Sequence, residues 1–128
     1  MANINFISTE NAPKAVGTYS QGTEHNGIYF FSGQIGLDPA TMKMRDDFNT
    51  QLEQILKNID GLLNASSLTR KDIIKTTIFL VDMGHFPIVN ACYEKFFQAP
   101  YPARSCVEVT KLPKEALIEI EVIAVKQK

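Results

Sequence analysis

One arginine stands at a position suited to holding a small acid. Arg104 opens a predicted strand, Arg104–Thr110, directly after the proline-rich stretch Ala99-Pro100-Tyr101-Pro102. Arginine presents a planar fork of donors that matches both oxygens of a carboxylate. Because side chains alternate along a strand, Cys106 and Glu108 share the face of Arg104. The residue types in this segment therefore favour carboxylate binding.

Acidic side chains are expected nearby, on what we predict to be the neighbouring strand. In the segment Leu117–Val125, Glu119 and Glu121 alternate with apolar residues. If their face meets Arg104 at a boundary between subunits, these charges must be paired or used, because isolated charges are rarely tolerated there. Two interpretations stay open: a structural ion pair of Arg104 with one glutamate, or a ligand site.

Four further positions are candidates for such a site. Ser32 and Gly33 end a predicted hairpin and offer a hydroxyl and backbone N–H groups, and Tyr19 lies in a loop. Asn90 interrupts the inner surface of a predicted helix. Each also has an ordinary structural explanation: a strand end, packing, or hydrogen bonding to buried backbone groups.

Other chemistries find little support. His25 and His85 stand alone, without triad or metal-ligand spacing, and no glycine-rich phosphate loop occurs. Cys106 has no histidine near it in sequence to activate it as a nucleophile, so we expect a small buried or site-lining group. Cys92 and Cys106 are expected to be reduced thiols, with a disulfide between them as the alternative. We predict no metal and no cofactor.

Length and composition indicate one ordinary domain. The 128 residues carry a net charge of −1, with 45% hydrophobic and 21% charged residues. This balance argues against a nucleic-acid surface, which normally shows as a basic patch. The start of the chain lacks a signal-peptide pattern, and no apolar run reaches membrane-spanning length. We expect a single cytosolic domain over residues 1–128 that contacts neither nucleic acid nor membrane.

The hydrophobic pattern predicts two helices and about six strands. An apolar stripe at helical spacing runs from Phe48 to Leu63, with Asp46 or Asp47 as N-cap, and a second helix is expected at about 84–98. The strands are expected at about 3–8, 20–25, 28–32, 73–81, 104–110 and 117–125. The pair Asn26-Gly27 predicts a hairpin turn. The strand–helix–strand order around the first helix predicts a parallel pair.

These elements predict an α+β domain: a mixed sheet with two helices on one face. The segment Leu117–Val125 is nevertheless apolar on both faces, and Ile28–Phe31 and Ile73–Val81 are mostly apolar throughout. A sheet whose second face met water would alternate with polar residues. Identical subunits are the expected cover for that second face.

Together, five motifs resemble the RidA (YjgF) family of enamine/imine deaminases. The similarity runs from about residue 8 to residue 125, and the motifs occur in the family's order and spacing. The motifs are Gly17-Thr18-Tyr19-Ser20-Gln21, Phe31-Ser32-Gly33-Gln34-Ile35, Asn90-Ala91-Cys92-Tyr93-Glu94-Lys95-Phe96-Phe97, Pro102-Ala103-Arg104-Ser105-Cys106-Val107-Glu108-Val109, and Leu112-Pro113 followed by Ile118-Glu119-Ile120-Glu121.

The resemblance implies a chorismate-mutase-like (ferredoxin-like) fold and a homotrimer with clefts between subunits. It implies cofactor-independent hydrolysis of 2-aminoacrylate and related 2-imino acids to 2-keto acids and ammonia. The expected activity is therefore that of a 2-iminobutanoate/2-iminopropanoate deaminase. One alternative is a trimer that binds small carboxylates without turnover and acts in regulation. Another, weaker alternative is an endoribonuclease.

The resemblance also implies roles for individual residues. Arg104 matches the arginine that grips the substrate carboxylate, and Glu119 matches the acid that positions water and assists proton transfer. The remaining matches are cleft-lining Tyr19 and Ser32, Gly33 and Cys106 with backbone groups toward the ligand, and Asn90 on the second helix. One departure is Thr18, which stands where the family usually has proline, so the loop that carries Tyr19 is expected to be less rigid.

Overall fold

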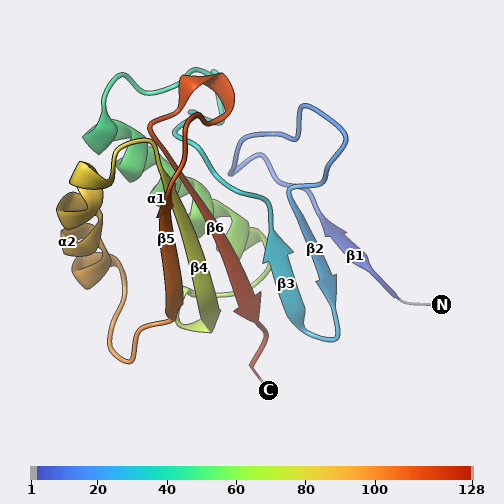
Figure 1. The fold of residues 1–128 in the computed structure, drawn as a ribbon. Helices are drawn as coiled ribbons and strands as arrows, with labels where there is room; N and C mark the ends of the chain where they lie inside the picture. The colour runs from blue at the N-terminus through green and yellow to red at the C-terminus, as the bar shows by residue number, and fades with distance from the viewer. Residues whose placement is uncertain (1–2, 128) are drawn as a thin grey trace.

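Six strands form one mixed sheet, and two helices cover one of its faces (Figure 1). This computed structural model describes residues 3–127. Residues 1, 2 and 128 of the expected domain lie outside the described residues, and residues 1 and 2 also belong to the start of the chain, where no signal-peptide pattern was found. The strands are β1 Asn5–Ile7, β2 Gly22–His25, β3 Ile28–Phe31, β4 Ile73–Leu80, β5 Ala103–Glu108 and β6 Ile118–Val125. The helices are α1 Phe48–Ala65 and α2 Phe86–Phe96, with short 3-10 turns at Arg70–Asp72, Met83–His85 and Pro113–Glu115.

The strand order is β1-β2-β3-β6-β4-β5, and it corrects two expectations. The strands on either side of α1 do not pair, because β6 lies between β3 and β4 and runs antiparallel to both. The parallel pair is β4 with β5, joined through α2. The strand beside β5 is therefore β4 and not β6. An interior place suits β6, because its residues Ile118, Ile120, Val122 and Ala124 are all buried.

The first helix forms as its sequence predicts. Asp47 is the N-cap and accepts a hydrogen bond from the Thr50 N–H at 2.9 Å, and the Thr50 side chain completes a capping box. A cap of this kind satisfies N–H groups that have no partner inside the helix. The apolar stripe then packs on the sheet, and its buried members are Phe48, Leu52, Ile55, Ile59, Leu62 and Leu63.

The second helix is shorter than expected at each end. It begins at Phe86 because the residues before it form a separate 3-10 turn, in which Asp82 accepts a hydrogen bond from Gly84 N–H at 2.8 Å. It ends at Phe96 because Phe97 is already extended. Its inner side buries aromatic residues, among them Tyr93 and Phe96.

The hairpin turn is formed as predicted. Asn26 and Gly27 connect β2 and β3 with φ angles of 53° and 81°. Both residue types tolerate positive φ, which matches the twist of the flanking strands. The turn fixes the pairing that places Phe31 in the core and Phe30 on the opposite face.

Buried amide side chains attach the irregular segment 33–47 to α1. Gln51, which is almost fully buried, donates from Nε2 to the Arg45 carbonyl at 3.0 Å and accepts at Oε1 from the Leu117 N–H at 2.9 Å. Asn58 donates to the Leu37 carbonyl at 3.0 Å. Since buried backbone groups need partners, these amides take the place of a regular ladder for this segment.

The side of the sheet away from the helices is here called the open face, and Figure 1 shows no helix over it. Phe6, Phe30 and Val107 lie there with exposed fractions of 67%, 51% and 43%. The register places further residues on it: Ile123, Lys75, Thr77, Phe79, Glu119, Glu121 and Ser105. The open face thus carries exposed apolar side chains, as predicted, but charged and polar residues lie among them on β4, β5 and β6. None of the described helices combines the length and apolar character needed to cross a bilayer.

Replacing Gln51 with leucine should destabilise the fold without changing the shape of the side chain much. The Leu117 N–H and the Arg45 carbonyl would lose their partners, and each part-buried group so stranded costs about 1–3 kcal/mol, so we expect a loss of about 2–6 kcal/mol. Urea denaturation measures it. Asn49→Leu, at an exposed position of the same helix, is the control and should stay within about 0.5 kcal/mol of wild type. Equal losses in both variants would contradict this role of Gln51.

Candidate functional site

Arg104 lies at the edge of the sheet, on the face covered by the helices. In the parallel pair it stands opposite Thr76 of β4, which is completely buried beneath α2 and α1. Its guanidinium Nη1 donates a hydrogen bond to Asn90 Oδ1 of α2 at 2.9 Å. Asn90 therefore holds Arg104 in place, and only one of the arginine's donors is used to do so.

Aromatic rings of α2 support the same guanidinium. Cζ of Arg104 lies 4.9 Å from the ring centroid of Phe86 and 5.6 Å from that of Tyr93. Contacts of this kind attract a cation to the ring face. The exposed side of the arginine opens into a cleft of about 340 Å³ lined by Asn90, Tyr93, Glu94, Tyr101, Pro102 and Arg104.

Two groups beneath Arg104 are kept in their neutral forms. Burial raises the pKa of the Tyr93 phenol to about 12. Burial also raises the pKa of the Cys106 thiol, although the nearby charge of Arg104 acts in the opposite direction. At neutral pH neither group supplies an anion, so neither acts as a base or a thiolate nucleophile. Cys92 and Cys106 are both free thiols, so the alternative of a disulfide is not formed.

Glu119 lies on the open face. It stands opposite Phe79 of β4, while Glu121 stands opposite Thr77. The Glu119 carboxyl group packs directly over the Cα atom of Gly33, where any side chain would collide with it. Burial, followed by the like charge of Glu121, raises the pKa of Glu119. A carboxyl group whose pKa is moved toward neutrality is suited to proton transfer.

Ser32, which directly precedes Gly33, lies beside the loop that carries Tyr19. The Ser32 hydroxyl donates to the Ser20 carbonyl at 2.6 Å, which ties the end of β3 to the Tyr19 loop. The Tyr19 hydroxyl accepts from Val16 N–H at 3.4 Å, and the side chain is 52% exposed. Tyr19 therefore lies at the surface of its loop, available to a neighbouring molecule.

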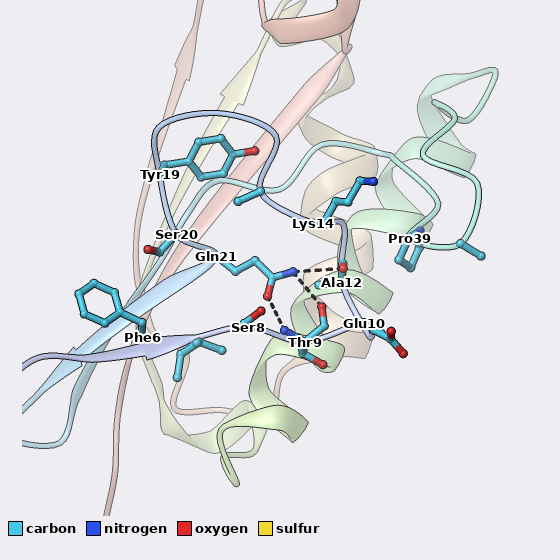
Figure 2. A pocket seen from close by; sticks show the side chains of 13 residues that line it. Phe6, Ser8, Thr9, Glu10, Ala12, Lys14, Tyr19, Ser20, Gln21 and Pro39 are labelled. Carbon is cyan, nitrogen blue, oxygen red and sulfur yellow. Dashed lines mark hydrogen bonds between the residues drawn. The ribbon is translucent and has the colours of Figure 1, made fainter.

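A second and larger cleft, of about 920 Å³, borders this loop (Figure 2). Its lining residues include Tyr19, Ser20, Lys14, Pro39 and Ala40. Beneath the cleft, the side-chain amide of the buried Gln21 forms hydrogen bonds with the backbone of Thr9, Ala12 and Pro13. Figure 2 shows part of this network. Gln21 thus anchors the first part of the loop, residues 9–13, and makes no side-chain hydrogen bond to the part around Thr18. Arg104 does not line this cleft.

The structure therefore divides the predicted site residues into two groups. Arg104, Asn90 and Cys106 lie between β5 and α2, whereas Glu119, Gly33, Ser32 and Tyr19 lie together elsewhere. The expectation that Arg104 and the glutamates sit on neighbouring strands is wrong, because β4 separates them and they point to opposite faces. An ion pair within one chain is absent too: across residues 3–127 the salt bridges are Arg45–Asp38 and Arg70–Asp60.

Sequence reasoning missed several residues around Arg104. The sequence analysis did not single out Phe86, Tyr93, Glu94 or Tyr101 as site residues. A signal existed for Glu94: it follows Asn90 by four residues on a helix, and residues at that spacing share a helix face. No comparable signal marks Tyr101, because its position depends on how the loop before β5 folds.

The fold and motifs have close counterparts among known proteins. A family model described as Endoribonuclease L-PSP matches residues 9–126. A curated 2-iminobutanoate/2-iminopropanoate deaminase of Salmonella typhimurium is 48% identical over 124 residues, which cover 94% of this chain and 97% of that protein. The protein of the same name from Escherichia coli K12 is 47% identical with the same coverage.

Solved structures agree. RidA from an Antarctic Psychrobacter species superposes with a TM-score of 0.93 at 38% identity, covering 95% of this chain and 99% of that one. The structure of Escherichia coli TdcF with bound serine gives a TM-score of 0.91 at 41% identity, covering 96% and 99%. The fold and its motifs thus define a RidA-type α+β protein, which confirms the predicted fold class. The chain belongs to the RidA (YjgF) family.

The raised pKa of Glu119 predicts a pH dependence of stability. The folded state keeps the Glu119 proton to higher pH than the unfolded state, whose carboxyl titrates near 4.5. The native state therefore binds more protons, and stability falls as pH rises from 4.5 through the raised pKa. Urea denaturation at pH 4.5 and at neutral pH should show a smaller fall for Glu119→Gln than for wild type.

Glu121→Gln is the matched variant for this measurement. It removes only the smaller cause of the shift, so its pH dependence should lie between those of wild type and Glu119→Gln. Identical pH dependence of stability in all three proteins would show that folding does not raise the pKa of Glu119.

Proposed function

We propose that this protein hydrolyses small 2-imino acids, such as those derived from 2-aminoacrylate, to 2-keto acids and ammonia, at clefts formed between identical subunits. The observation that carries this proposal is the anchored guanidinium of Arg104, which faces a cleft with donors to spare. The two curated relatives described above bear the name of this activity and match nearly the whole chain. Deamination of imines is hydrolysis of a C=N bond.

The division of the site residues supports a site shared between subunits. Arg104 and Glu119 point to opposite faces of one sheet, so a single chain does not bring them together around one small ligand. The open face includes the well-exposed apolar side chains of Phe30 and Val107, which a second copy would cover. We infer a homotrimer in which one subunit contributes Arg104, Asn90 and Cys106 and its neighbour contributes Glu119, Gly33, Ser32 and Tyr19.

The chemistry asks little more than these groups supply. An iminium carbon is already electrophilic, so the site has to hold the carboxylate, admit a water molecule and move protons. In our proposal Arg104 binds the substrate carboxylate through its fork of donors. Glu119 takes a proton from the attacking water and passes one to the departing nitrogen. Ser32 and Tyr19 line the opposite wall, and the backbone of Gly33 and Cys106 faces the ligand.

Two alternatives each have their own test. A trimer that only binds carboxylates would leave the rate of ammonia release unchanged when a dehydratase generates 2-aminoacrylate beside it. The name of the matching family model suggests an endoribonuclease. The cleft at Arg104, however, has a single cationic side chain among its lining residues, whereas binding of a polyanion such as RNA normally uses several. RNA cleavage that survives Arg104→Ala and disappears on stringent purification would identify a contaminant.

We place the activity in the cytosol, where the two free thiols stay reduced.

Arg104 should be essential for turnover. Arg104→Ala is expected to abolish imine hydrolysis, and Arg104→Lys should lose about 10- to 150-fold, because it keeps the charge but loses a charge-assisted hydrogen bond worth about 1.5–3 kcal/mol. Ammonia release in the coupled assay measures both. Lys95→Ala, at an exposed position of α2 outside the cleft, is the control and should retain wild-type rates. Full activity in Arg104→Ala would refute the assignment.

Mixing inactive subunits tests whether the site is shared. Arg104→Ala and Glu119→Gln trimers should each be inactive, because every cleft lacks one of the two groups. After unfolding and refolding together in equal amounts, about one quarter of clefts in random hybrids would combine an intact Arg104 with an intact Glu119. Activity should therefore return to about that fraction of the wild-type value. If hybrids form, as shown by a mass-tagged subunit, and stay inactive, the two residues do not act across a subunit boundary.

A further inference from the structure

The cleft at Arg104 contains a second charged group for which the proposed function has no use. Glu94 lines it together with Arg104, yet the two do not form a salt bridge. Among the described residues the side-chain carboxylate of Glu94 has no hydrogen-bond partner either. It lies one turn of α2 beyond Asn90, the residue that holds the guanidinium. A cation and an anion therefore share one small cleft without neutralising each other.

The arrangement keeps both charges available. Asn90 and the rings of Phe86 and Tyr93 hold Arg104 from the α2 side, so its side chain does not need Glu94 for support. Glu94 projects from the same face of the helix, since residues four apart on a helix are neighbours on its surface. Tyr101 and Pro102 complete the wall of the cleft beside them. A ligand entering the cleft meets a guanidinium and a carboxylate.

A carboxylate ligand alone would satisfy Arg104 and be repelled by Glu94. A ligand that carries a carboxylate and a cationic nitrogen satisfies both. We propose that Glu94 recognises the positively charged nitrogen of the ligand, so that the cleft selects zwitterions: α-amino acids and the protonated, iminium form of 2-imino acids. This inference rests on the proposed function for the role of Arg104, and it adds the protonation state of the substrate.

The consequence for the reaction is direct. A 2-imino acid is attacked by water far more readily as the iminium cation than as the neutral imine, because the cation is the stronger electrophile. A carboxylate close to the nitrogen favours the protonated form by attraction between opposite charges. After hydrolysis the product is a keto acid, which has a carboxylate and no cation. Glu94 then repels the product, and this assists its release.

Binding of two matched ligands tests the inference without requiring turnover. L-2-aminobutanoate is a zwitterion, and (S)-2-hydroxybutanoate has the same skeleton and carboxylate with a hydroxyl in place of the ammonium group. Isothermal titration at low ionic strength gives Kd for each. In wild type the amino acid should bind more tightly. Glu94→Gln should reduce the ratio of the two affinities about 2- to 5-fold, the range for an exposed ion pair, while hydroxybutanoate binding is unchanged or tighter.

Glu53→Gln is the control, because Glu53 is an exposed carboxylate of α1 that does not line the cleft. It should leave the ratio of affinities as in wild type. Added salt should shrink the effect of Glu94→Gln, since it screens exposed charges. The inference is overturned if Glu94→Gln leaves the ratio unchanged, if Glu53→Gln changes it equally, or if wild type binds neither ligand.

The two proposals fail in distinguishable ways. If Arg104→Ala abolishes turnover and the binding of both ligands while Glu94→Gln leaves the ratio of affinities intact, the deaminase stands and the role of Glu94 falls. If the ratio changes as expected in a wild-type protein that releases no ammonia from 2-aminoacrylate, the zwitterion cleft stands and the deaminase falls.

Discussion

The position of β4 between β5 and β6 is the constraint on which the site depends. Side chains alternate along each strand, and the register aligns Arg104 with buried Thr76 and Glu119 with Phe79 of the opposite face. A shift of one residue in either pairing would move every functional side chain of that strand to the other face. The register of the three strands therefore separates Arg104 from Glu119 by the thickness of the sheet.

Because of this separation, the open face matters for the candidate site as well as for assembly. A chain that covered the face with its own helices would leave Glu119 and Gly33 enclosed and out of reach of any arginine. By leaving Phe30, Ile123 and Val107 uncovered by helices, the fold creates a surface that a second copy covers in the proposed trimer. In the proposed trimer, burial of this surface and completion of the site are one event. Stability of the assembly and catalysis would then depend on the same face.

The helix α2 contributes more than packing. Its inner side fills the core, its edge holds Arg104 through Asn90, and its next turn presents Glu94 to the same cleft. Buried Tyr93 and Cys106 stay neutral beneath the guanidinium, so they do not satisfy its charge. The positive charge of Arg104 is therefore held in place but left available, which is the condition that binding of an anionic ligand requires.

The sequence by itself determined the elements, because each depends on local pattern and turn chemistry. The Asn26-Gly27 turn, the cap at Asp47 and the apolar stripe of α1 were predictable within a residue or two, as was the bare second face of the sheet. The motifs were enough to indicate the family. Only the tertiary structure decided that β6 enters between β3 and β4, since many strand orders satisfy the same alternation. That order separated Arg104 from Glu119, and the fold of the loop before β5 brought Tyr101 and Pro102 beside Glu94. Contacts between residues distant in sequence depend on packing free energies summed over the whole core, which no local pattern records.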